Sequence, residues 1–430
     1  MTLLNQVFKP ENLTRAWRWV QSNPEAAYKG YFRALYANYR IADDALIEGL
    51  RDRLIRGVYE PAHACKIYFP KKSGGLRPYS LLTVEDQIVY QAMMNIVAEQ
   101  LTPRVRDKHF SQVFSHIYAG KSSPWFYRKW QNGYFEMNRA ARKVFGEGFI
   151  YTASFDLTAF YDSVDHQVLR HFLIELGCDI DFNRLLLTCL VQWTATQRKM
   201  RIYHGHGIPQ GPLSSGLLAE VILQHFDSGR TIHDAVRYLR YVDDIRLFAK
   251  TEGDLRRAVA ELDYLSKEVG LFPQAAKIAI RKVNDIDEEL KTVSKPEVIE
   301  LDLDAEKVDQ RALGARLNEL SPKFRINEAT EFKFLLARAE PRKRLSLRLI
   351  RILDHHPFLY SDVLRYMRKY DRLPADISDW LVKQLRSNPI YAAMIAELLD
   401  TAEGRMDIFS LKELDGYVKE HWNPKSVRKI

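Results

Sequence analysis

Two adjacent aspartates, Asp243 and Asp244, interrupt a stretch that otherwise reads as β-strand, RYVDDIRLFA (residues 240–249). The flanking runs are short and rich in β-branched and aromatic residues. Asp is disfavoured in strands, and a buried carboxylate without a partner is costly. We therefore predict a β-hairpin with the pair at its tip, because side chains that diverge along a strand can converge at a turn. Convergent carboxylates indicate Mg²⁺ or Mn²⁺, and a solvent-exposed Asp-Asp turn is the alternative.

A second acidic site occurs in FDLTAFYDSVDH (residues 155–166), where Asp156 closes an apolar strand. With the pair at the hairpin tip it supplies the three carboxylates of a two-metal phosphoryl-transfer site. The alternative is three unrelated surface aspartates, but each of them lies in an apolar strand context. Asp162 and Asp165 differ from them, because they lie in the following loop and helix start, where Asp is favoured.

The composition indicates a globular chain with a polyanionic partner. The chain has 430 residues, 46% of them hydrophobic, and a formal net charge of +9, which suits nucleic acid. Cys65, Cys178 and Cys189 form neither a disulfide set nor a zinc spacing, so we expect reduced core thiols in a cytoplasmic protein. The N-terminus has no signal-peptide pattern, and no run of ~18 apolar residues occurs, so no membrane association is expected.

The periodicity of the chain divides it into four regions. Residues 1–60 are a helical N-terminal extension in which Asn12 could cap a helix, and 61–283 are a mixed α+β region. In that region we predict strands at KIYFP, LRPYSLL and 149–156, an amphipathic helix over 84–101, and helices over 165–176, 182–194 and 254–269; residues 110–147 are unassigned. Residues 284–309 are acidic and form a linker, and 310–430 are successive helices. The predicted fold class is α+β with an α-helical C-terminal domain.

Four motifs resemble those of reverse transcriptases and follow that family's order: FPKKSGGLRP (69–78), FDLTAFYD, GIPQGPLSS (207–215) and YVDD (241–244). The resemblance covers roughly residues 45–282. It implies a right-hand polymerase whose fingers and ferredoxin-like palm occupy 61–283, followed by a thumb-like helical domain. It also implies that Asp156, Asp243 and Asp244 are catalytic metal ligands for Mg²⁺, with Mn²⁺ possible, helped by the Leu157 carbonyl.

The resemblance further implies five nucleotide-binding residues: Lys71, Arg77, Tyr161, Gln210 and Lys277. Tyr161 would exclude a ribose 2′-OH, although a core aromatic is the alternative, and Gln210 would lie near the incoming nucleotide, although a plain turn residue is the alternative. Arg77 and Lys71, or its neighbour Lys72, would neutralise the triphosphate unless they are simply solvated. Lys277 follows GLFPQAA and could protonate pyrophosphate, but PQAAK departs slightly from the family's spacing.

The chain most resembles bacterial defence-associated reverse transcriptases of the unknown-group and Abi-like kinds, which act against phage, commonly with a non-coding RNA. Retron and group II intron enzymes are the nearest rivals within the family. The expected function is an RNA-directed DNA polymerase that uses dNTPs to make cDNA from an RNA template. Outside this class, the alternatives are an RNA-dependent RNA polymerase, which Val242 and Tyr161 argue against, and an RNA-binding scaffold without catalysis.

A stretch near residues 125–130 (WFYRKW) interleaves aromatic side chains with Arg128 and Lys129. Such a combination can stack on unpaired bases and neutralise phosphates. A second basic stretch, in the C-terminal region, places Arg344, Arg348 and Arg351 on one helical face. We predict that Arg128, Lys129, Arg344 and Arg348 contact a specific structured RNA. The alternatives are a fingers core for Trp125 and Trp130, and a solvated face for the arginines.

Overall fold

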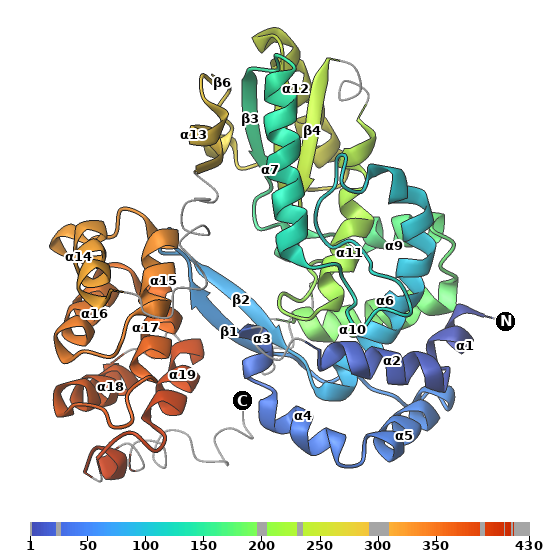
Figure 1. Cartoon of the computed structure of the whole chain (residues 1–430). Coiled ribbons are helices and arrows are strands. Elements are labelled where there is room, and N and C mark those ends of the chain that lie inside the picture. The colour runs from blue at the N-terminus through green and yellow to red at the C-terminus, as the bar shows by residue number, and fades with distance from the viewer. Residues whose placement is uncertain are drawn as a thin grey trace. The chain divides into compact units, whose positions relative to one another are not determined.

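The computed structural model describes residues 2–22, 27–195, 204–229, 235–291, 309–387, 392–407, 409–413 and 416. The chain forms two compact units. The first comprises Met1–Cys65 and Ser80–Glu289, and the second comprises Lys66–Tyr79 and Leu290–Ile430. The predicted α+β fold with a helical C-terminal part is confirmed (Figure 1).

The first unit begins with five helices: α1 (Leu3–Val7), α2 (Pro10–Val20), α3 (Ala27–Gly30), α4 (Arg33–Arg40) and α5 (Asp43–Ile55). The predicted helical start is therefore confirmed, but Asn12 is not an N-cap, because α2 begins at Pro10 and its N-cap is Lys9. It lies inside α2 and is buried, and its Nδ2 donates to the carbonyls of Val7 and Ala92, both at 3.0 Å. The bond to Ala92 ties α2 to the long helix α6 (Val84–Val105), against which α2 packs.

Helix α6 is not amphipathic, contrary to the prediction. Its buried side chains lie on every face of the helix and include the polar Asp86, Gln87, Gln91 and Asn95. These polar groups are buried because they have partners: Gln91, for example, donates to Asn95 and accepts from Ser214. The polar side chains of α6, which the sequence pattern placed on an exposed face of the helix, therefore form an internal hydrogen-bonded network.

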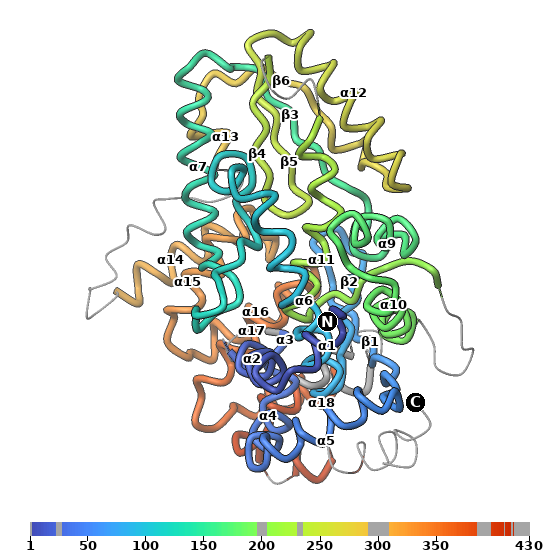
Figure 2. The backbone as a smooth tube through the Cα atoms, turned by 90° about the vertical axis from the view of Figure 1, so that its right-hand side faces the viewer, coloured from blue at the N-terminus to red at the C-terminus, as the bar shows by residue number. Residues whose placement is uncertain are grey.

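A four-stranded antiparallel sheet carries the acidic motifs, with strand order β4-β5-β3-β6 (Figure 2). The strands are β3 (Tyr151–Asp156), β4 (Val236–Tyr241), β5 (Asp244–Ala249) and β6 (Arg281–Lys282). The predicted hairpin is thus confirmed as β4–β5. Helix α12 (Glu252–Glu268) packs against β3, β4 and β5, and α7 (Trp130–Gly146) packs against β4 within the segment that the sequence left unassigned.

The first unit also contains the helices α8 (Phe160–Ser163), α9 (His166–Glu175), α10 (Ile180–Thr194) and α11 (Ser214–Leu223), and the boundary between the units falls within α13 (Ile286–Lys291). Asp165 is the N-cap of α9, because its carboxylate accepts from the backbone of Gln167 and Val168. This agrees with the expectation that Asp165 has a different task from Asp156. Most of the predicted linker, residues 292–308, lies outside the described residues.

The second unit contains the tip of a β-hairpin and the C-terminal helices. Strands β1 (Cys65–Pro70) and β2 (Leu76–Leu81) flank the predicted turn, and Phe69 stacks on Tyr360 with ring centroids 6.3 Å apart. The helices are α14 (Gln310–Leu320), α15 (Ala329–Arg338), α16 (Lys343–His355), α17 (Tyr360–Met367), α18 (Ala375–Ser387) and α19 (Ala392–Ala402).

Two of the three cysteines lie in the core. Cys178 and Cys189 are buried as predicted, but Cys65 is exposed at the start of β1 and is not a core thiol. Over the described parts of the chain, none of the helices is both long and apolar enough to cross a membrane.

Candidate active site

Asp156 and Asp244 lie directly opposite each other where β3 ends and β5 begins. Directly opposed residues of antiparallel strands have Cβ atoms about 4.5–5.5 Å apart, so the register brings together two carboxylates from distant parts of the sequence. Burial raises the pKa of Asp244; the charge of Arg246 opposes that rise and the charge of Asp156 adds to it. Burial and the like charge of Asp156 therefore disfavour the ionised form of Asp244, and a nearby cation favours it.

Lys277 supplies a cation to Asp156. The backbone N–H of Gln274 donates to the Asp156 carbonyl, and that of Thr158 donates to the Phe272 carbonyl, both at 2.8 Å. This pairing is followed by the 3₁₀ turn Ala275–Lys277, which brings Lys277 Nζ to 2.6 Å from Asp156 Oδ2. The unusual spacing PQAAK thus still carries the lysine to the aspartate.

Asp243 lies in the two-residue loop of the β4–β5 hairpin, between the paired residues Tyr241 and Asp244. The other loop residue, Val242, has a positive φ of 56°. This conformation suits a tight hairpin but is unfavourable for a β-branched residue, at a cost of about 1–3 kcal/mol. The tip that carries the two aspartates is therefore a strained turn held by its surroundings.

The three aspartates provide part of the ligand set that a hard divalent cation needs. Within the described parts of the chain, no group of three or more His, Cys, Asp or Glu side chains is arranged to hold a metal ion. Asp156 and Asp244 nevertheless offer opposed carboxylates, with Asp243 in the adjoining turn, and carboxylate oxygens are the ligands that Mg²⁺ prefers. Since Lys277 pairs with Asp156, a cation would have to displace or share that contact.

The loop that contains Gln210 is bound to the segment after β3. Ile208 N donates to the Tyr161 carbonyl at 2.7 Å, and Gln210 Nε2 donates to Asp162 Oδ2 at 3.3 Å. Tyr161 is partly exposed beside the buried Phe160 and is therefore not a core aromatic. Tyr161 and Gln210 thus lie on adjoining segments in the first unit.

Glycine is required next to Gln210. Gly211 has φ +111°, and a Cβ at this position would lie 2.3 Å from Cδ2 of Tyr28. The Tyr28 hydroxyl donates to the Ser80 carbonyl at 2.8 Å, and Ser80 N donates to the Gln210 carbonyl at 2.9 Å. The turn is therefore packed and hydrogen-bonded on its inner side.

Lys71, Lys72 and Arg77 are exposed on the β1–β2 hairpin of the second unit. The turn between the strands is closed by a hydrogen bond from Lys71 N to the Gly75 carbonyl at 2.7 Å. These basic residues belong to the second unit, whereas Asp156, Asp243 and Asp244 belong to the first.

The predicted RNA contacts differ in their surroundings. Trp125 and Trp130 are 43% and 64% exposed and are not part of a core, and Arg128 and Lys129 between them are also exposed. In the second unit Arg344 is exposed, whereas Arg348 donates to both the carbonyl and the hydroxyl of Ser321. Arg348 therefore has a structural partner at the end of α14.

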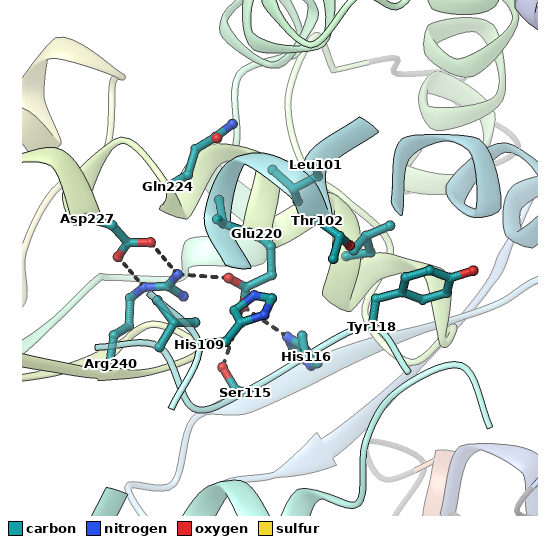
Figure 3. A pocket seen from close by; sticks show the side chains of 13 residues that line it. Leu101, Thr102, His109, Ser115, His116, Tyr118, Glu220, Gln224, Asp227 and Arg240 are labelled. Atoms are coloured by element: carbon teal, nitrogen blue, oxygen red, sulfur yellow. Dashed lines mark hydrogen bonds and ion pairs between the residues drawn. The ribbon is translucent and has the colours of Figure 1, made fainter. Parts of the chain in front are cut away.

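A buried ion cluster lies behind the hairpin tip, where the sequence predicted none. Arg240 is 1% exposed, and it donates to Asp227 and Glu220 at 2.8 Å (Figure 3). Burial tends to raise the pKa of Glu220, but Arg240 and His116 outweigh it and hold the pKa at about 2. We call Arg240, Glu220, Asp227 and Ser115 the Arg240 network. The one sequence signal for it is a single Glu inside the apolar helix LLAEVIL.

Known proteins resemble this chain in sequence. Residues 69–335 match the family model described as "Reverse transcriptase (RNA-dependent DNA polymerase)". Protein YkfC of Escherichia coli (strain K12) is 25% identical over 282 residues, which is 58% of this chain and 70% of that protein.

Solved structures show weaker likenesses. Apo telomerase from Candida tropicalis is 10% identical with a TM-score of 0.41, over 86% of this chain and 68% of that one. The same enzyme truncated from its C-terminal domain gives a TM-score of 0.38 at 10% identity, over 52% of this chain and about half, 51%, of that one. A partial Cas6-RT-Cas1–Cas2 complex gives a TM-score of 0.32 at 17% identity, over 62% and 43%.

Proposed function

Because the chain belongs to the reverse transcriptase (RNA-dependent DNA polymerase) family, it is an RNA-directed DNA polymerase, and we propose that Asp156, Asp243 and Asp244 form its nucleotidyl-transfer site. The observation that carries this proposal is the direct pairing of Asp156 with Asp244 beside the Asp243 turn. A divalent cation held there, Mg²⁺ or Mn²⁺, would lower the pKa of the attacking 3′-hydroxyl and neutralise charge on the leaving group.

Lys277 is the proposed proton donor to the leaving group. In the reaction the 3′-oxygen of the primer bonds to the α-phosphorus, and the bond from that phosphorus to the bridging oxygen of pyrophosphate breaks. An ammonium group beside the site can give a proton to the departing pyrophosphate. The 2.6 Å contact between Lys277 and Asp156 supports this role, because it holds the amine next to the reacting groups.

Tyr161 is proposed to contact the sugar of the incoming nucleotide, and Gln210 is proposed to lie near that nucleotide. The partial exposure of Tyr161 and its position on the segment after Asp156 support steric rejection of a 2′-OH. Lys71 and Arg77 are proposed to neutralise the triphosphate, which their exposure on the β1–β2 hairpin permits.

The template is proposed to be a specific structured non-coding RNA, and the biological role to be antiphage defence. The exposed Trp125 and Trp130, with Arg128 and Lys129 between them, support an RNA contact in the first unit. The defence role is supported by the resemblance of the motifs to defence-associated reverse transcriptases. Retron-type or group II intron-type enzymes are the alternatives within the family, and sequencing the RNA that copurifies with the protein distinguishes them.

The proposed activity is tested with a primed RNA template and either dNTPs or NTPs, with Mg²⁺, with Mn²⁺ and with EDTA. We expect DNA extension that depends on the divalent cation. Preferential NTP incorporation would instead indicate an RNA polymerase. Retention of RNA with no incorporation under any metal condition would indicate a binding scaffold.

A further inference from the structure

The turn that carries Asp243 has a backbone conformation that its own sequence does not favour. The first residue of a two-residue hairpin loop has a positive φ, which Gly and Asn adopt readily and branched side chains do not. Here that residue is Val242, with φ +56°. Strained residues of this kind persist where the surrounding structure holds them. The contacts of Val242 therefore determine where the next two side chains, Asp243 and Asp244, point.

Both backbone polar groups of Val242 are bound by side chains. Its N–H donates to Ser115 Oγ at 2.6 Å, and its carbonyl accepts from Arg240 Nη1 at 3.1 Å. Ser115 comes from the loop before α7, and Arg240 comes from β4. Figure 3 shows both side chains directed toward Glu220 of α11.

The two groups that hold Val242 are themselves fixed. Asp227 accepts from Nε and Nη2 of Arg240, both at 2.8 Å, and Glu220 accepts from Nη2 at 2.8 Å. The guanidinium of Arg240 is planar, so its bonds to Asp227 and Glu220 fix its orientation. Nη1 can therefore point only toward the turn. Ser115 Oγ in turn lies 3.5 Å from Glu220 Oε1.

We infer that the Arg240 network is a positioning device that fixes the Val242 backbone and so aims the Asp243 and Asp244 carboxylates, a role that rests on the proposed nucleotidyl-transfer function. No member of the network is proposed to touch substrate. The network transmits the rigid position of α11 to the hairpin tip through one ion cluster and two hydrogen bonds.

The competing explanation is that the cluster only stabilises the fold. Tyr238 provides a matched control, because its hydroxyl donates to Asp227 Oδ1 at 2.9 Å in the same buried cluster and not to Val242. Tyr238→Phe removes a bond from the cluster and leaves both bonds to Val242. Ser115→Ala removes one bond to Val242 and leaves the Arg240 ion pairs intact.

The experiment compares Ser115→Ala, Arg240→Lys and Tyr238→Phe in the full chain. Arg240→Lys keeps the charge that Asp227 and Glu220 require, which avoids the misfolding expected of Arg240→Ala. Two quantities are measured: hydrogen–deuterium exchange of the peptide spanning residues 239–247, and kcat and KM for dNTP on a primed RNA template.

For Ser115→Ala and Arg240→Lys we expect faster exchange at the hairpin tip and a kcat lower by about 10- to 100-fold, since small misplacements of catalytic groups have effects of this size. KM for dNTP should stay within about twofold of wild type, because uniform binding is not altered. Tyr238→Phe should change neither quantity. Equal behaviour of all three variants would overturn the inference.

The outcomes separate this inference from the proposed function. If the wild-type chain does not polymerise but Ser115→Ala still speeds exchange at the tip, the positioning of the turn stands and the polymerase assignment fails. If the wild type polymerises and Ser115→Ala alters neither exchange nor kcat, the polymerase assignment stands and the positioning role is wrong.

Discussion

Asp156 and Asp244 face each other across β3 and β5, one as the last residue of its strand and the other as the first. Each carboxylate has a cationic neighbour: Lys277 Nζ lies 2.6 Å from Asp156 Oδ2, and Arg246 Nε lies 3.9 Å from Asp244 Oδ2. Without these charges the pair would repel. Each aspartate of the opposed pair is therefore balanced by a nearby basic side chain.

Lys277→Met is expected to strengthen metal binding while slowing catalysis. Removing the ammonium frees Asp156, and an exposed ion pair of this kind is worth roughly 0.2–1 kcal/mol, so the half-saturating Mn²⁺ concentration should fall by about 1.4- to 5-fold. The rate of dNTP incorporation at saturating metal should fall as well. Lys267→Met removes an equally short pair, to Asp263 at 2.6 Å on α12, and serves as the control. Weaker Mn²⁺ binding in Lys277→Met would contradict the competition.

Tyr161→Ala is expected to relax sugar selection. Loss of the ring opens space for a 2′-OH, so the ratio of ribonucleotide to deoxyribonucleotide incorporation should rise, as measured by competing NTP and dNTP on the same primer. Tyr161→Phe keeps the ring and should keep the wild-type ratio. An unchanged ratio in Tyr161→Ala would remove the steric role.

Charge reversal of Arg128 and Lys129 together is expected to weaken retention of the copurifying RNA. The slope of log affinity against log salt should become shallower by about 0.7 for each single-strand phosphate that the protein no longer neutralises. Arg184→Glu on α10 together with Arg256→Glu on α12 changes the net charge by the same amount and is the control. Unchanged RNA affinity and an unchanged salt slope would show that Arg128 and Lys129 do not contact the RNA.

Arg344→Glu tests the second unit separately, because Arg344 is exposed and its replacement leaves the packing of α16 intact. We expect weaker RNA retention without a change in extension of a generic primed template. Arg348 is less suitable as a probe, since its guanidinium binds Ser321 and its replacement would disturb the end of α14. RNA retention equal to that of the wild type would show that this face of α16 does not contact the RNA.

Glu220→Gln is expected to destabilise the first unit by about 1–3 kcal/mol at pH 7, because the buried Arg240 loses a charged acceptor. The pKa of Glu220 in the folded protein is about 2, below its usual value of 4.5. Ionised Glu220 therefore stabilises the folded state fully at pH values above about 4.5. That contribution is lost as pH falls toward the folded pKa. The difference in unfolding free energy between wild type and variant, measured by urea denaturation, should therefore shrink as pH falls from about 4.5 toward 2, the window that linkage sets.

The exposed Glu175→Gln on α9 provides the comparison for that experiment. It should have little effect at any pH in the range. A destabilisation of Glu220→Gln that does not depend on pH would show that the Glu220 charge does not contribute to folding.

The strand ends of the site were predictable because an aspartate in an apolar strand leaves few physical options. The positions of Asp156 and Asp244 follow from this reasoning, and the hairpin tip follows from the flanking residues. Their register across β3 and β5 was not predictable, because strand pairing depends on contacts between segments far apart in the sequence.

Buried polar residues account for most of the wrong or missing predictions. The sequence pattern favours a cap for Asn12 and a polar helix face for Gln91 and Asn95, yet each has a partner from a distant segment. Arg240 escapes sequence reasoning in the same way, since its buried acceptors Asp227 and Glu220 are separated from it along the chain. Periodicity identifies the apolar face of a helix but does not show which polar side chains find partners inside.

The most direct test of the central claim is dNTP incorporation by Asp156→Asn and by Asp244→Asn on a primed RNA template, with Asp181→Asn on the surface of α10 as the matched control. We predict that both site variants lose incorporation while their thermal unfolding temperature stays the same or, for Asp244→Asn, rises slightly, since burial and the charge of Asp156 disfavour ionised Asp244. Asp181→Asn should behave as wild type. Near-normal DNA synthesis by either site variant would contradict the claim that these two opposed carboxylates carry out nucleotidyl transfer.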